Sequence, residues 1–191
     1  MTRTSSPYNV RHVSLGLPTN IAATTYNNLE LLPSANGITF TLGTDTYQTI
    51  TTNGYLTIGN GTNTGTISTT SYSPNVTVTG DLAVNTAATL SGSGTGTITV
   101  SGGDTTGNGT VNLTGGTFLL DGTGNFGGNT NWTFYNLAFG NGLDSQTTTA
   151  TGTGSITVSN KFTINQNQIL NAGSNKTWNL AGYGLYDIKA I

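Results

Sequence analysis

The sequence predicts an all-β fold, and more specifically a β-solenoid, in which short strands and corners wind into stacked coils. A nine-residue strand–turn–strand phrase occurs three times, at Ile50–Ile58, Val76–Val84 and Ile156–Ile164. A second phrase, G-T-I-T-V-S-G-G at Gly96–Gly103, recurs as G-T-V-N-L-T-G-G at Gly109–Gly116. No segment keeps a 3.6-residue apolar period, and Thr, Gly and Asn are weak helix formers. Internal repetition of strand-plus-corner units is typical of solenoids.

The spacing of the repeated phrases predicts the length of a coil. Related strands begin at Ile50, Val76, Ile98 and Ile156, so the first two intervals are similar and the third is more than twice as long. These intervals indicate coils of roughly twenty to thirty residues with insertions. A β-sandwich is the alternative, because short strands with frequent turns also build one. The fixed order of strand, corner and strand favours the solenoid.

Two regions are predicted along the chain. Residues 1–23 form an N-terminal arm or cap strand, and residues 24–191 form the solenoid repeat domain. Val13, Leu15 and Leu17 alternate with small residues in the first region, which indicates one isolated strand. This strand either packs on the end of its own solenoid or adds to the exposed edge of a neighbouring molecule.

The strands of the repeat domain are predicted from β-branched alternation between Gly, Asn, Asp and Ser clusters. They are expected at Thr24–Leu32, Ile38–Leu42, Tyr47–Thr51, Tyr55–Ile58, Thr64–Ser68, Asn75–Thr79, Leu82–Asn85, Thr95–Ser101, Thr110–Thr114, Thr117–Leu120, Phe134–Phe139, Ser155–Val158, Phe162–Asn165, Gln168–Asn171 and Thr177–Leu180. Inward apolar residues would stack into a narrow core, with outward Thr rows between neighbouring strands.

Composition excludes several classes of function. Only 6% of the residues are charged, the net charge is -2, and no Lys or Arg lies between Arg11 and Lys161. Nucleic-acid binding requires cationic neutralisation of phosphates, so we expect no nucleic-acid partner. The chain has no Cys, which excludes disulfides and thiolate sites. No apolar span is long enough to cross a bilayer as a helix, so no membrane insertion is expected, and Met1–Pro18 lacks the apolar core of a signal peptide.

No catalytic residues and no metal or cofactor site are predicted. Asp81 and Asp104 are separated by one coil length, as are Asp121 and Asp144, so each pair is spaced to stack on neighbouring coils. Corner turns favour Asp for structural reasons, and that interpretation is preferred. The segment from Asp121 to Asn125 resembles an oxygen-rich Ca²⁺ loop, yet it lacks the acid spacing of known calcium loops. A turn is the expected structure there.

Two surface features suggest ligand binding in principle. T-x-T triplets such as Thr44–Thr46 and Thr77–Thr79 are typical of flat solenoid faces that order water or bind ice, but they do not recur at constant spacing. Trp132, Tyr135 and Phe139 are a candidate platform for glycan stacking. An aromatic plug that fills a wider coil is the preferred interpretation of these three residues.

The phrases G-T-G-T-I-T-V-S-G-G, G-T-V-N-L-T-G-G-T-F and N-G-Y-L-T-I-G-N-G resemble the Thr/Gly/Asn-rich repeats of large bacterial surface proteins. Adhesin and autotransporter-passenger β-solenoids belong to this group. The resemblance covers residues 37–182. It implies an extracellular, non-enzymatic scaffold for adhesion or fibre formation, and it transfers no site residues.

The sequence therefore predicts a structural protein of the cell surface that forms a homo-oligomer or homopolymer through its ends. The residues expected at contacts between subunits lie at both ends of the chain: Val13, Leu15, Leu17, Tyr183, Leu185, Tyr186, Ile188 and Ile191. The first alternative is a phage virion component, such as a fibre, spike or capsid decoration, located in the virion. The second is a carbohydrate-binding or polysaccharide-active solenoid that contacts a glycan.

Overall fold

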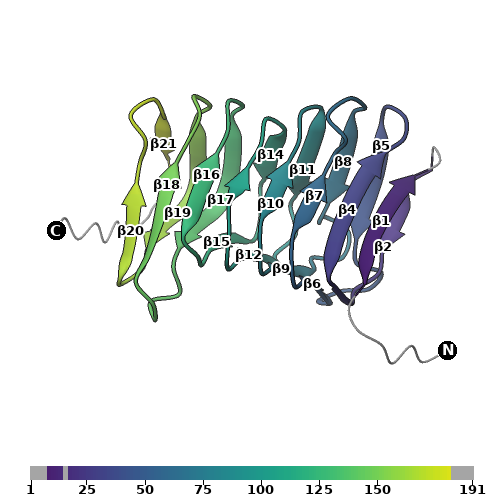
Figure 1. Cartoon of the computed structure of the whole chain (residues 1–191), viewed down its shortest axis with the longest axis horizontal. Helices are drawn as coiled ribbons and strands as arrows, with labels where there is room; N and C mark the ends of the chain where they lie inside the picture. The colour runs from purple at the N-terminus through teal and green to yellow at the C-terminus, as the bar shows by residue number, and fades with distance from the viewer. Residues whose placement is uncertain (1–7, 15–16, 182–191) are drawn as a thin grey trace.

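The computed structural model describes residues 8–14 and 17–181, which form twenty-one strands and no helix (Figure 1). Every strand pair in this part of the chain is parallel. The strands stack side by side from β1 at one end of the molecule to β20 and β21 at the other. The predicted β-solenoid is thus confirmed. The β-sandwich alternative is wrong, because the sheets of such a fold are antiparallel.

Each coil places one strand on the first face, which is an eight-stranded sheet. Eight strands give a solenoid of about eight turns. The strands of this face, in spatial order, are β1 (Asn9–Ser14), β4 (Asn28–Pro33), β7 (Leu56–Ile58), β10 (Leu82–Val84), β13 (Thr105–Thr106), β16 (Gly124–Gly127), β18 (Gln146–Ala150) and β20 (Gln168–Asn171).

The second and third faces share a larger sheet, because β17 and β19 run across the corner between them. The second face holds β2 (Thr19–Ile21), β5 (Ile38–Leu42), β8 (Gly65–Ser68), β11 (Ala88–Gly92), β14 (Thr110–Leu113), the first parts of β17 (Trp132–Phe139) and β19 (Ile156–Ile164), and β21 (Trp178–Leu180). The third face holds β3 (Thr25–Tyr26), β6 (Thr49–Thr52), β9 (Asn75–Val78), β12 (Thr97–Val100), β15 (Thr117–Leu120) and the second parts of β17 and β19.

The repeated phrases align with the coils only in part. Ile50 pairs with Val76, and Val76 pairs with Ile98, so each of these two intervals is one coil. The interval from Ile98 to Ile156 is not a whole number of coils in this register. Ile156 lies on the second face, where it pairs with Trp132, whereas the ladder from Ile98 continues to Phe118 on the third face. The third copy of the phrase therefore turns a different corner.

The core is one continuous column of inward apolar side chains. The column is most aromatic around β16 and β17. The ring of Phe126 lies 5.5 Å from that of Trp132 and 5.5 Å from that of Phe139, both at near-perpendicular angles. Edge-to-face contacts of this kind stabilise beyond simple burial. Trp132 and Phe139 are fully buried and only Tyr135 is exposed at the corner, so these residues form a plug and not a glycan platform.

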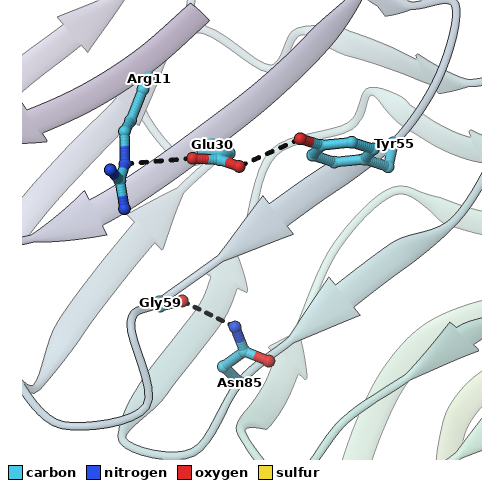
Figure 2. A network of polar contacts seen from close by, with 5 residues as sticks. All are labelled: Arg11, Glu30, Tyr55, Gly59 and Asn85. Atoms are coloured by element: carbon cyan, nitrogen blue, oxygen red, sulfur yellow. Dashed lines mark hydrogen bonds and ion pairs between the residues drawn. The ribbon is translucent and has the colours of Figure 1, made fainter.

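Uncharged side chains stabilise the corners by bonding to the next coil. The Asn75 side-chain oxygen accepts the backbone N–H of Thr97 at 2.9 Å, and that of Asn131 accepts the N–H of Ser155 at 2.9 Å. The Asn85 amide donates to the Gly59 carbonyl at 2.8 Å (Figure 2). Buried or corner backbone groups need such partners. This explains how a chain rich in Asn and Thr folds with so few charges.

Candidate functional site

The two ends of the stack are where the described chain leaves hydrogen-bonding strands without a partner. At one end, β1, β2 and β3 pair only with the strands of the second coil. At the other end, β20 pairs only with β18, and β21 pairs only with β19. Each of these strands offers its outer edge, and unpaired edges are templates for another chain.

The N-terminal end exposes part of the core. Val10 and His12 on β1 stack in register on Leu29 and Leu31, which are fully buried in the second coil. No described strand covers Val10 and His12 from the other side, so both remain partly exposed. Partial burial lowers the pKa of His12 by desolvating its charged form. The end of the column is therefore apolar, with one titratable ring.

The C-terminal end is also apolar, and it is more aromatic. Trp178 on β21 is half-buried, with its ring 5.7 Å from that of Phe162 and 6.4 Å from that of Phe139. Leu170 on β20 and Leu180 on β21 pack against the same core and are also partly exposed. At both ends of the described stack, the outermost coil therefore leaves part of the apolar core exposed.

A polar cluster lies on the first face, close to the N-terminal end. Arg11 Nε lies 3.2 Å from Glu30 Oε2, and the Tyr55 hydroxyl donates to Glu30 Oε1 at 3.1 Å (Figure 2). The hydrogen bond to Glu30, followed by weaker desolvation and charge effects, raises the pKa of Tyr55. Arg11 is mostly exposed, so the ion pair contributes less than about 1 kcal/mol. The cluster connects β1 and β4 to Tyr55, the residue just before β7.

The cluster borders a shallow pocket of ≈ 100 Å³, lined by Asn9, Val10, Arg11, Asn28, Glu30 and Tyr55. Ligand sites for small molecules are commonly clefts of about 300–1,000 Å³. The pocket is smaller than this range, and its polar groups already bond to one another. The cluster is better suited to holding three coils together than to binding a small molecule.

The predicted acid pairs behave differently from each other. The N–H of Asp104 donates to Asp81 Oδ1 at 2.8 Å, so these two residues do stack, at a corner. Asp104 Oδ1 in turn accepts the N–H of Asn125 at 2.8 Å. Asp121 does not repeat this contact with Asp144, because its Oδ1 accepts the backbone N–H of Asn141 and its Oδ2 accepts the side-chain amide of Asn141. Asp81 and Asp104 fit the structural role of corner residues.

Within the described residues, no group of three or more His, Asp or Glu side chains is placed to hold a metal ion. The carboxylate of Asp121, at the start of the candidate Ca²⁺ loop, is occupied by Asn141 at 2.9 Å and 2.8 Å. None of the described elements is a helix with the length and apolar character to cross a membrane.

Two of the predicted contact residues, Val13 and Leu17, are described, and both lie in the first coil. Val13 is 48% exposed on the outer side of β1, and Leu17 is 74% exposed just before β2. Leu15 and the C-terminal set of Tyr183, Leu185, Tyr186, Ile188 and Ile191 lie outside the described residues. Sequence reasoning missed Val10, His12 and Trp178. A sequence signal for Trp178 existed, since it lies in the predicted strand Thr177–Leu180.

The chain matches no protein-family model, no curated protein and no solved structure. The functional interpretation of the ends therefore rests on the contacts and exposure of this chain alone.

His12 predicts a pH dependence of stability. Because its pKa is lower in the folded state than the ordinary value of 6.5, the unfolded chain binds the proton more readily. The contribution of His12 is therefore most favourable above pH 6.5, and it decreases as the pH falls through that value towards the folded pKa. We expect urea midpoints to fall between about pH 8 and 5, the range in which histidine titrates. In His12→Gln this component is absent, and equal pH profiles for the two proteins would contradict the assignment.

Proposed function

We propose that the chain is a non-enzymatic, extracellular structural protein, a solenoid subunit that assembles through its ends into a surface fibre or an adhesive stalk. The observation that carries the proposal is the pair of apolar ends, at which the outermost described strands have no described partner on their outer side. At the N-terminal end, β1 has a free outer edge among the described strands and carries the partly exposed residues Val10 and His12. At the C-terminal end, β20 and β21 have such edges, and β21 carries the partly exposed Trp178. Both ends have the same faces and the same parallel strand direction.

Head-to-tail contact is the arrangement that continues this architecture. The first coil of one molecule would add to the last coil of the next, extending both sheets with parallel strands. Strand addition supplies backbone hydrogen bonds, and the stacked core supplies apolar burial. A contact between two different surfaces of the same molecule gives an open filament unless the rotation closes a ring. This supports a homopolymer as the assembled form.

The extracellular location is supported by composition and by the resemblance to bacterial surface repeats. The corners and faces rely on Thr and Asn hydrogen bonds more than on charges, since only 6% of the residues are charged. Such bonds are less sensitive to salt than ion pairs are. A surface protein that meets variable ionic strength gains from this. The glycan-binding alternative has less support, because Trp132 and Phe139 are buried.

The test compares three proteins by electron microscopy and by light-scattering mass over a range of concentrations. The wild type is expected to form filaments whose mass rises with concentration. Val10→Lys places a charge on the inward side of β1, at the exposed end, and is expected to abolish filaments. Thr77→Lys is the matched control, because Thr77 is an outward residue of β9 in a central coil. It is expected to keep them.

Circular dichroism checks that both variants remain folded. A wild type that stays monomeric at all concentrations would exclude end-to-end assembly. Discrete trimers in place of filaments would instead favour the virion spike or fibre. Filaments that persist in Val10→Lys would show that another surface drives assembly.

A further inference from the structure

The outward side chains of the second face form two ranks that run along the stack, hereafter the second-face ranks. The first rank is Thr39, Thr66, Thr89 and Thr110. The second rank is Asn20, Thr41, Ser68, Ser91, Asn112, Thr133, Thr157 and Asn179. The second rank passes through all eight coils without a break. Every member carries a hydroxyl or an amide.

The spacing of residues along the sequence does not predict these ranks. Thr39, Thr66, Thr89 and Thr110 are in register on neighbouring strands, although the number of residues between them changes at each coil. The varying residues lie in the corners and leave the register of the strands intact. Irregular spacing along the sequence is therefore compatible with regular spacing in the fold. On the second face, a Thr followed two residues later by Thr, Ser or Asn occurs on each of β5, β8, β11 and β14.

The second face differs from the other two in charge. None of its described strands, the first part of β19 included, contains Asp, Glu, Lys, Arg or His. The first face carries Arg11 and Glu30. The third face carries Lys161 in one outward rank, and the apolar residues Leu119 and Ala138 interrupt the other. The second face is thus the one face whose described polar ranks are uninterrupted.

The second-face ranks are also held in place. Neighbouring parallel strands lie about 4.8 Å apart, and outward residues on one strand lie about 6.6 Å apart. Thr is stiff about χ1, and Thr66 and Thr89 are half-buried between their neighbours. The inward residues between the ranks, such as Phe40 and Ile67, are fully buried. The result is a rectangular lattice of fixed hydroxyl and methyl groups.

We propose that the second face binds ordered water, specifically the surface of an ice crystal. Small soluble ligands require a concave site, and phosphate-rich polymers require cations, which this face lacks. Glycan platforms use exposed aromatic rings, whereas Phe40, Trp132 and Phe134 on this face are buried. An uncharged lattice of hydroxyls, amides and methyls, with every strand in register, instead complements a ligand that is itself periodic and uncharged.

The ranks are preorganised, so binding requires little further ordering of side chains. Repetition over the full stack adds many weak contacts on one rigid body, and effective affinity rises with the number of contacts made together. The inference does not depend on end-to-end assembly, because the ranks lie on the side of the stack and not at its ends.

The test uses ice as the probe. The purified protein is scored for partition into a slowly growing ice hemisphere and for inhibition of ice recrystallisation. Thr89→Tyr places a bulky ring in the centre of the first rank and is expected to lower the fraction bound at least about tenfold, or ~1.4 kcal/mol. Thr77→Tyr is the matched control, because Thr77 lies between Thr51 and Thr99 on the third face as Thr89 lies between Thr66 and Thr110. It is expected to leave ice binding unchanged.

Several outcomes would overturn the inference. They are exclusion of the wild type from ice, full binding by Thr89→Tyr, or loss of binding in Thr77→Tyr alone. Binding to crystalline cellulose or chitin with none to ice would assign the face to a polysaccharide. Matching thermal unfolding of the two variants controls for a general loss of the fold. Val10→Lys, which tests assembly, is expected to retain ice binding, so failure of either proposal is seen separately.

Discussion

Trp132→Ala is expected to lower the free energy of unfolding by about 3–5 kcal/mol, the range for removing a fully buried Trp. Trp132 is 0% exposed on β17, and its ring contacts Phe126 at 5.5 Å and Phe134 at 6.4 Å between centroids. Its indole N–H donates to the Gly109 carbonyl at 3.0 Å. The substitution therefore leaves a cavity in the aromatic part of the core and removes one of the two hydrogen bonds that the Gly109 carbonyl accepts, the other coming from the Thr130 hydroxyl.

The measurement is equilibrium urea unfolding followed by circular dichroism. Trp178→Ala is the matched control, because Trp178 also donates its indole N–H to a backbone carbonyl, that of Ala172 at 2.9 Å. Trp178 lies in the last described coil and is only half-buried, so its removal leaves a smaller cavity. Equal decreases in the free energy of unfolding in the two variants would show that the contribution of an aromatic residue to stability does not depend on its position along the stack.

Gly107→Ala is expected to lower the free energy of unfolding by about 2–5 kcal/mol, from backbone strain plus a steric clash. Gly107 has a φ of 140°, which L side chains rarely adopt. A Cβ at this position would also collide with the backbone carbonyl of Val84 on the preceding coil. Val84 ends β10 and Gly107 directly follows β13, and these two strands are paired, so neither backbone can move without disturbing the pairing of the two coils.

Gly61→Ala separates the two contributions. Gly61 has a φ of 80°, and a Cβ there would meet no atom within 4 Å. Gly61→Ala is expected to lower the free energy of unfolding by about 1 kcal/mol, from the left-handed backbone alone. The difference between the two urea midpoints measures how tightly the corners stack. A cost for Gly61→Ala as large as that for Gly107→Ala would remove the clash from the explanation.

Strands were predictable where the inward residues are large and apolar. The predicted ranges Ile38–Leu42, Thr117–Leu120 and Gln168–Asn171 match β5, β15 and β20. Within the repeat domain the missed strands are β11, β13, β16 and β18. Their inward positions include Thr105 in β13, Gly124 in β16 and Thr148 in β18. Small or polar inward residues hide the two-residue period, and such strands form because the neighbouring coils supply the pairing.

The candidate sites were harder to predict, because the register depends on corners of unequal length. Residues that bond between neighbouring coils lie as few as 18 apart at Asn9 and Asn27, and as many as 30 apart at Pro33 and Asn63. A spacing of 23 residues therefore aligns Asp81 with Asp104 in one pair of coils. The same spacing fails for Asp121, which contacts Asn141. The second-face ranks could not be predicted from the sequence for the same reason.

Coils that pair only with their immediate neighbours also determine how the molecule carries a load. Force applied along the stack acts on one ring of contacts at a time, so the terminal coil detaches before the next one is disturbed. A released coil of about 25 residues extends to roughly 85 Å of chain, at ~3.4 Å per residue. A solenoid built in this way lengthens in discrete steps under tension. When the tension is released, the detached coil refolds onto the coils that remain folded, because their outermost strands supply the pairing.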